Sequence, residues 1–228
     1  PLYSSAASDV YKRQGRAVGG RYDAEWGFRY GEMQPLPETR GEMLAVAAAV
    51  GADPDNDLFF GARATRRAVL DADLSDRRVV GFATHGLMPG DAPGIGKPAL
   101  AMAATADDGE SPLLELDDVL NLRLNAQWVL LSACNTAAGE RGGAAMSGLV
   151  RGFFFAGARS VLATHWAVDS ESSAALSTAT FEAAKGGTAR AESLRQAQLA
   201  LIDGRIGAGR WSHPYHWAPY ALFGDPQR

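Results

Sequence analysis

Two short apolar runs, residues 79–84 and 129–133, constrain the fold of this chain more than any other feature. Each is continuous and includes β-branched residues, which is typical of a strand buried on both faces of a parallel sheet. Helical patterns lie before, between and after these runs, and such alternation of strands and helices favours an α/β domain. The sequence therefore predicts a three-layer α/β/α sandwich with a mostly parallel central sheet.

Each run is followed at once by a residue that can take part in catalysis. His85 and Gly86 follow the first run, and Cys134, the single cysteine of the chain, follows the second. Open α/β sheets place functional residues at the carboxyl ends of their strands. A thiol is mostly protonated at neutral pH, and an adjacent imidazole can take up its proton. The strand ends therefore indicate a His85–Cys134 dyad, while an inert, buried cysteine is the alternative that the spacing leaves open.

Hydrolysis through a thiolate also needs donors for the negative charge that develops on the substrate oxygen. Gly86 has no Cβ, so the backbone at this position can approach a substrate closely. The backbone N–H groups of Gly86 and Cys134 are therefore the candidate oxyanion hole.

The composition is ordinary for a soluble globular protein and argues against several functional classes. With 46% hydrophobic and 21% charged residues and a net charge of -4, nothing indicates a nucleic-acid or membrane partner. No apolar run approaches the roughly 20 residues that span a bilayer. One cysteine forms no internal disulfide and no cysteine-based zinc site, so we expect a reducing, cytoplasmic compartment. The histidines show no zinc-binding spacing and no nucleotide-binding motif is complete, so we expect no metal and no cofactor.

The amino-terminal part of the chain differs from the rest. Residues 1–14 show no helix or strand period and resemble a translated sequencing adapter, so we expect a non-native segment outside the fold. Residues 15–37 are rich in Gly, Arg and aromatics and contain two prolines, which predicts a linker or irregular edge. The domain is expected over residues 38–226. If the first segment is non-native, the natural protein begins upstream and this chain is a C-terminal fragment.

Periodicity and breaker residues predict the remaining elements. Helices are expected over residues 38–50, 65–70, 117–122, 172–185 and 188–202, with another between the Gly-rich loop 139–143 and Gly157. Strands are expected over residues 58–60, 160–166 and 217–223, and residues 99–104 are expected to pair with residues 113–116.

Ordered motifs around the two strand ends resemble the CHAT family of caspase-like peptidases. The resemblance rests on residues 82–87, 132–137, 146–149, 151–161, 194–198 and 213–220. It covers most of the chain, roughly residues 36–225. It implies a caspase- and separase-like sheet in which His85 is the general acid–base and Cys134 the nucleophile that cleaves peptide bonds, without a metal.

The resemblance also implies a biological setting. Related domains follow tetratricopeptide or other sensor regions, so we expect a bacterial enzyme that acts on a protein or peptide partner under the control of an N-terminal region absent from this chain. The alternative is a catalytically silent domain that keeps the CHAT fold and binds peptides. The presence of both His85 and Cys134 favours the enzyme.

Residues 166–169 (Trp-Ala-Val-Asp) are similar to a stretch that helps to form the P1 pocket in this family. Asp169 would pair with a substrate Arg or Lys at that pocket. The other interpretation is that Asp169 or Ser170 caps the helix that follows. His165 is expected to be partly buried and hydrogen-bonded, and His213 and His216 are expected to pack among aromatic residues without a catalytic role.

Overall fold

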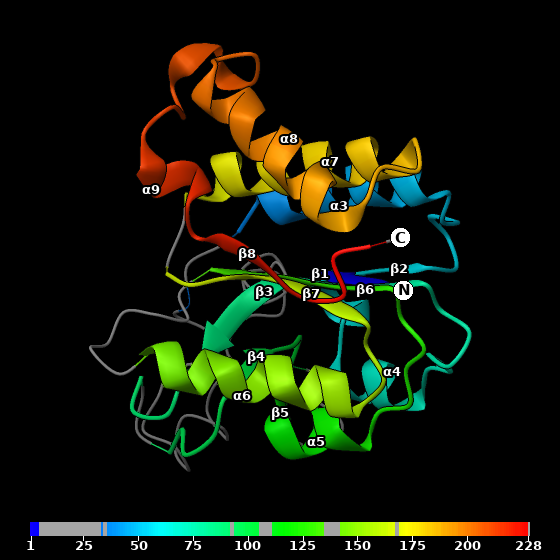
Figure 1. Cartoon of the computed structure of the whole chain (residues 1–228). Helices are drawn as coiled ribbons and strands as arrows, with labels where there is room; N and C mark the ends of the chain where they lie inside the picture. The colour runs from blue at the N-terminus through cyan, green and yellow to red at the C-terminus, as the bar shows by residue number, and fades with distance from the viewer. Residues whose placement is uncertain are drawn as a thin grey trace.

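The computed structural model describes residues 1–4, 33, 36–91, 94–104, 111–134, 142–166 and 169–227. Helices lie on both faces of a central sheet, which confirms the three-layer α/β/α sandwich (Figure 1). The main path of the sheet has the order β2-β1-β3-β6-β7-β8, and its neighbours are parallel except for β7 and β8. These strands are β1 (Leu2–Ser4), β2 (Leu58–Phe60), β3 (Val79–Leu87), β6 (Trp128–Cys134), β7 (Ser160–Thr164) and β8 (Tyr220–Gly224).

Two groups of helices cover the sheet (Figure 1). One face carries α3 (Glu38–Val50), α7 (Ser170–Lys185) and α8 (Arg190–Ile202). The other face carries α4 (Arg66–Asp71), α5 (Leu116–Asn121) and α6 (Gly142–Phe155), together with the antiparallel pair β4 (Ala99–Ala101) and β5 (Leu113–Glu115). The short helix α9 (Pro214–Trp217) precedes β8, and single 3₁₀ turns lie at Gly61–Arg63 and Gly207–Gly209.

Local signals in the sequence set the helix boundaries. The chain leaves α3 at Gly51, whose φ of 71° is accessible to glycine without strain. Thr65 begins α4 by accepting a hydrogen bond from the backbone N–H of Ala68 at 3.0 Å. The predicted boundaries of these helices are therefore confirmed to within a residue or two.

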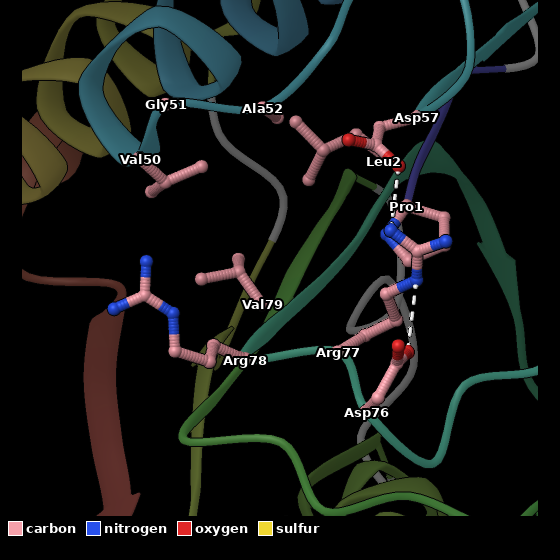
Figure 2. A pocket seen from close by; sticks show the side chains of 10 residues that line it. All are labelled: Pro1, Leu2, Val50, Gly51, Ala52, Asp57, Asp76, Arg77, Arg78 and Val79. Atoms are coloured by element: carbon pink, nitrogen blue, oxygen red, sulfur yellow. Dashed lines mark hydrogen bonds and ion pairs between the residues drawn. The ribbon is translucent and has the colours of Figure 1, made fainter.

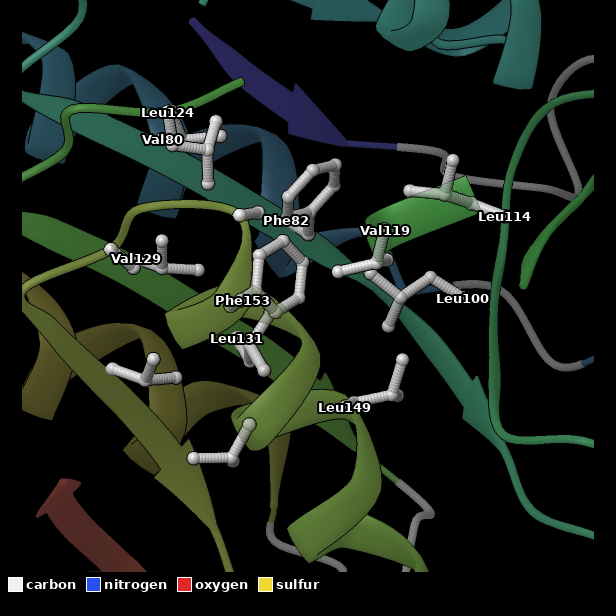
Figure 3. Close-up of a cluster of buried hydrophobic side chains, with 14 of the residues drawn as sticks. Val80, Phe82, Leu100, Leu114, Val119, Leu124, Val129, Leu131, Leu149 and Phe153 are labelled. Atoms are coloured by element: carbon white, nitrogen blue, oxygen red, sulfur yellow. The ribbon is translucent and has the colours of Figure 1, made fainter. Parts of the chain in front are cut away.

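The sheet separates two hydrophobic cores. Along β6, Val129 and Leu131 face the core beneath α6, whereas Leu130 faces the core beneath α3 and α7. Phe82 of β3 meets Phe153 of α6 with ring centroids 5.7 Å apart, at the centre of the first core (Figure 3). Burial on both faces explains why the strands that carry the candidate site are continuous apolar runs.

The first residues of the chain take part in the fold, which corrects the expectation that residues 1–14 lie outside it. Leu2–Ser4 forms β1, which pairs in parallel with β2 on one side and β3 on the other. Tyr3 stacks between Phe59 and Phe82, with ring centroids 4.8 and 5.4 Å away. Three residues are too few to show a strand period in the sequence. They form a strand because they pair with the edges of both β2 and β3. The origin of this segment stays a prediction.

The carboxyl-terminal strand begins later than predicted. Residues 217–223 are aromatic and suggested one strand, but Trp217 ends the helical turn α9 and the strand begins at Tyr220. Pro214 explains the difference, because its fixed φ suits the first position of a helix. His213 caps this turn by accepting a hydrogen bond from the N–H of Tyr215 at 3.2 Å.

Candidate functional site

The predicted dyad residues occupy neighbouring positions in the sheet. β3 and β6 are parallel, and their register makes His85 the Cα partner of Cys134. His85 is buried, and Cys134 is the last residue of β6, described here by its backbone. The strands thus bring the two residues together at the carboxyl edge of the sheet, which is where they were expected. Residues 135–141, including most of the Gly-rich loop 139–143, lie outside the described residues.

The His85 strand continues past the histidine, which corrects the expectation that it ends at Thr84. β3 extends to Leu87, because Gly86 and Leu87 pair antiparallel with β4. Thr84 adds a second link by donating a hydrogen bond from Oγ1 to the carbonyl of Ala101 in β4. His85 is therefore held within a strand and not in a loop. The use of the Gly86 and Cys134 N–H groups as an oxyanion hole stays a prediction.

β6, which ends at Cys134, is held by a buried polar network on the face of the sheet that α3 and α7 cover. Ser132 Oγ donates a hydrogen bond to Glu42 Oε2 of α3 at 3.0 Å, and Ser177 Oγ of α7 donates to Oε1 at 2.5 Å. Ser173 Oγ lies 3.2 Å from Ser132 Oγ and is hydrogen-bonded to the hydroxyl of Tyr220. The network thus connects α3, α7 and β8 to a residue two positions before Cys134.

Burial raises the pKa of Glu42 from 4.5 to about 7, against the opposing effect of the hydroxyls of Ser177 and Ser132. Its side chain is only 3% exposed. Sequence reasoning missed this residue, although a signal was present. Glu42 lies one and four residues before Met43 and Val46, which are buried on the inward face of α3, so its spacing placed it on that face.

Asp169 lies at the N-terminus of α7, which follows β7 at the same edge of the sheet. Its Oδ2 accepts a hydrogen bond from the N–H of Ser172 at 2.9 Å, so the capping interpretation is correct. Nδ1 of His216 lies 4.0 Å from the same carboxylate oxygen and 3.1 Å from Ser172 Oγ. The side chain of Asp169 is 42% exposed, which leaves the carboxylate accessible. A role in the P1 pocket is compatible with capping and stays a prediction, and residues 167 and 168 lie outside the described residues.

The other histidines differ in their surroundings: His213 is exposed and caps α9, and no ring contact is found for it among the described residues, whereas His165 and His216 lie against aromatic rings. His216 contacts Tyr215 edge-on with centroids 5.4 Å apart, as expected. His165 is exposed, which corrects the prediction of partial burial. The reason is that β7 ends at Thr164, so His165 leaves the core and meets Phe223 edge-on at 5.7 Å.

A pocket of about 190 Å³ lies away from this site (Figure 2). It contains the first residues of β1 and β3, Leu2 and Val79, and thus lies at the amino edge of the parallel strands. Arg77 within it pairs with Asp57 at 2.7 Å and with Asp76 at 3.2 Å. These contacts are structural ion pairs at the opposite edge of the sheet from His85.

The described residues offer neither a metal centre nor a membrane-spanning helix. In that part of the chain, no group of three or more His, Cys, Asp or Glu side chains is arranged to hold a metal ion. The helices described there are also too short or too polar to cross a membrane.

Comparison with known proteins adds the family. A family model described as CHAT domain matches residues 5–225. Tetratricopeptide repeat protein 28 of Mus musculus is 29% identical over 220 residues, covering 84% of this chain and 9% of the mouse protein. The Homo sapiens protein of the same name is 27% identical over 220 residues, covering 84% of this chain and 8% of its own length. The chain thus spans less than a tenth of the length of these relatives.

Proposed function

Because this chain belongs to the CHAT domain family, a caspase-like peptidase family, we propose that it is a cysteine endopeptidase acting through His85 and Cys134. The observation that carries the proposal is the register of β3 and β6, in which these two residues are partners. Adjacent positions on parallel strands place the Cα atoms about 5 Å apart, within the reach of an imidazole and a thiol. The substrate is a peptide bond in a protein partner.

In the proposed reaction, His85 takes the proton of the Cys134 thiol, and the thiolate attacks the carbonyl carbon of the peptide bond. The oxygen that becomes negative accepts hydrogen bonds from the N–H groups of Gly86 and Cys134. His85 then donates its proton to the leaving amine, and the C–N bond breaks to give a thioester. Water, deprotonated by His85, hydrolyses the thioester and releases the carboxylate product and the thiol.

We further propose that Asp169 selects a basic residue at P1. Its exposed carboxylate lies at the start of α7, beyond the strand next to β6. A guanidinium can bind a carboxylate through two parallel hydrogen bonds, whereas an ammonium acts as a point charge. Arg is therefore the preferred P1 residue in this proposal.

A regulatory region upstream of the catalytic domain completes the proposal. Two relatives are named for tetratricopeptide repeats, and this chain matches less than a tenth of their length. This supports a natural protein in which a repeat region precedes the domain and controls access to His85 and Cys134. The control acts on whether the dyad is aligned.

A peptidyl acyloxymethyl ketone with Arg at P1 tests the proposed function. Cys134 is the single cysteine, so one adduct by intact mass spectrometry identifies the labelled atom. We expect labelling in the wild type and its loss in His85→Ala, with His165→Ala, an exposed histidine after β7, as the matched control that keeps labelling. Binding of the parent peptide without any adduct would instead support the catalytically silent, peptide-binding domain.

A further inference from the structure

The hydrogen bonds that lead to Glu42 all run in the same donor-to-acceptor order. Both carboxylate oxygens accept hydrogen bonds from serine hydroxyls, Oε2 from Ser132 and Oε1 from Ser177. Because Ser132 uses its proton for Glu42, the hydroxyl of Ser173 is left to donate to Ser132. Tyr220 in turn donates to Ser173. When Glu42 is ionised, the protons along this path all point toward one carboxylate.

Protonation of Glu42 changes this arrangement. A neutral carboxyl carries one donor, so one of its two serine partners must turn from donor to acceptor. If the partner is Ser132, its own proton points back toward Ser173 and the order along the path reverses. Every member of the path is buried, so no member can turn to solvent instead.

The path ends on the strand that carries the proposed nucleophile. Ser132 is two residues before Cys134, and its register partner Ala83 is two residues before His85. On the other side, Glu42 belongs to α3, which packs extensively along α7. A change in the hydrogen bond at Ser132 therefore occurs two residues away from the proposed dyad along the strand.

We propose that Glu42 is a positioning residue that fixes the Cys134 strand end through Ser132, and that its protonation state alters this fixing. The proposal rests on the proposed function, because it assigns Cys134 the role of nucleophile. Glu42 itself touches no reacting atom. Its role is to hold the strand where the thiol and the imidazole of His85 align.

The titratable and charged groups on the elements around Glu42 are Glu38 and Arg40 on α3, Glu171, Glu182 and Lys185 on α7, His85 on β3, Cys134 on β6, which is described by its backbone alone, and Tyr220 on β8. Within the described residues, none of them forms an ion pair or a direct hydrogen bond with the Glu42 carboxyl. Tyr220 reaches it through Ser173 and Ser132. Burial is therefore the main cause of the raised pKa of Glu42, the two serine hydroxyls oppose it, and no charged group among the described residues contributes.

Alkylation of Cys134 by iodoacetamide, followed by intact mass, tests this inference without a peptide substrate. The key pair of variants is Ser132→Ala and Ser177→Ala, because each removes one hydroxyl donor from the same carboxyl and only the first lies on β6. We expect Ser132→Ala to lower the second-order rate constant about tenfold and Ser177→Ala to leave it nearly unchanged, since a small displacement suffices to disturb an aligned pair.

The pH profile of alkylation separates positioning from a general effect on folding. Because burial raises the pKa of Glu42 to about 7, the wild-type profile should contain an inflection near that pH in addition to the one that comes from the Cys134 thiol and His85. Glu42→Gln keeps the size of the side chain and replaces one accepting oxygen by an NH2 donor, as in the protonated carboxyl, but it does not titrate, so this additional inflection should disappear. Thermal unfolding of each variant monitors the fold in parallel.

Equal effects of Ser132→Ala and Ser177→Ala, or a wild-type pH profile unchanged by Glu42→Gln, would overturn the inference. His85→Ala, measured in the same assay, reports on the dyad separately. If the His85→Ala variant is alkylated at the same rate as the wild type, the proposed function fails. The comparison of Ser132→Ala with Ser177→Ala still decides whether the network positions Cys134.

Discussion

Replacing Glu42 by Gln should remove a pH-dependent loss of stability. In the folded protein burial raises the pKa of this carboxyl from 4.5 to about 7. The folded state therefore holds the proton more tightly than the unfolded state. The stabilising contribution is fully present below the unfolded pKa, and it is lost as the pH rises through the folded pKa.

The size of the effect follows from the two pKa values. At 1.36 kcal/mol per pH unit, the interval between 4.5 and about 7 corresponds to roughly 3 kcal/mol of unfolding free energy. No discount for solvent screening applies, because the side chain is 3% exposed. This is a large fraction of the roughly 5–15 kcal/mol that stabilises a typical domain.

Urea unfolding of both proteins between about pH 4.5 and about pH 8 measures this contribution. All other titrating groups are common to the two proteins, so they cancel in the difference between the two free energies. We expect Glu42→Gln to gain roughly 3 kcal/mol over the wild type across this range. Parallel curves would refute the reasoning, because they would mean that folding does not change the affinity of Glu42 for its proton.

Substitutions at three further positions test other parts of the structure. Asp169→Asn keeps an N-cap acceptor for Ser172 but removes the charge, so labelling by an Arg-P1 electrophile should fall relative to a neutral P1 probe while the melting temperature stays constant. Tyr3→Ala should cost about 3–5 kcal/mol in urea unfolding, whereas Tyr3→Phe should be neutral or stabilising, because this buried hydroxyl has no hydrogen-bond partner among the described residues. Gly157→Ala should destabilise by about 2 kcal/mol or more in the same assay, because φ is +110° and a Cβ would lie 2.1 Å from the carbonyl oxygen of Leu124. An unchanged unfolding midpoint for Gly157→Ala would contradict that backbone conformation.

The parts of the fold that the sequence predicts are those fixed by local or repetitive signals. β3 and β6 are buried on both faces, so their composition alone identifies them. The end of α3 depends on Gly51 and the start of α4 on Thr65, and both signals lie within the element they define. The adjacency of His85 and Cys134 followed from these elements, because parallel strands place their carboxyl ends at one edge.

The parts that could not be predicted depend on contacts between distant segments. β1 has three residues, and only the edges of β2 and β3 make it a strand. The extension of β3 through His85 depends on β4, which lies in a separate part of the chain. The Glu42 network joins residues separated by 90 and 135 positions, so spacing along the sequence says nothing about their contact.

The two ends of the proposed dyad are anchored in different layers of the sandwich. Thr84, next to His85, is hydrogen-bonded to β4 on the side of α6, whereas Ser132, close to Cys134, is hydrogen-bonded to α3 on the side of α7. The relative position of His85 and Cys134 therefore depends on how both layers pack against the sheet. If His85 and Cys134 form the dyad as proposed, a partner that binds either layer would change its alignment without touching it, and the hydrogen bonds of Glu42 would transmit this change on the α3 side.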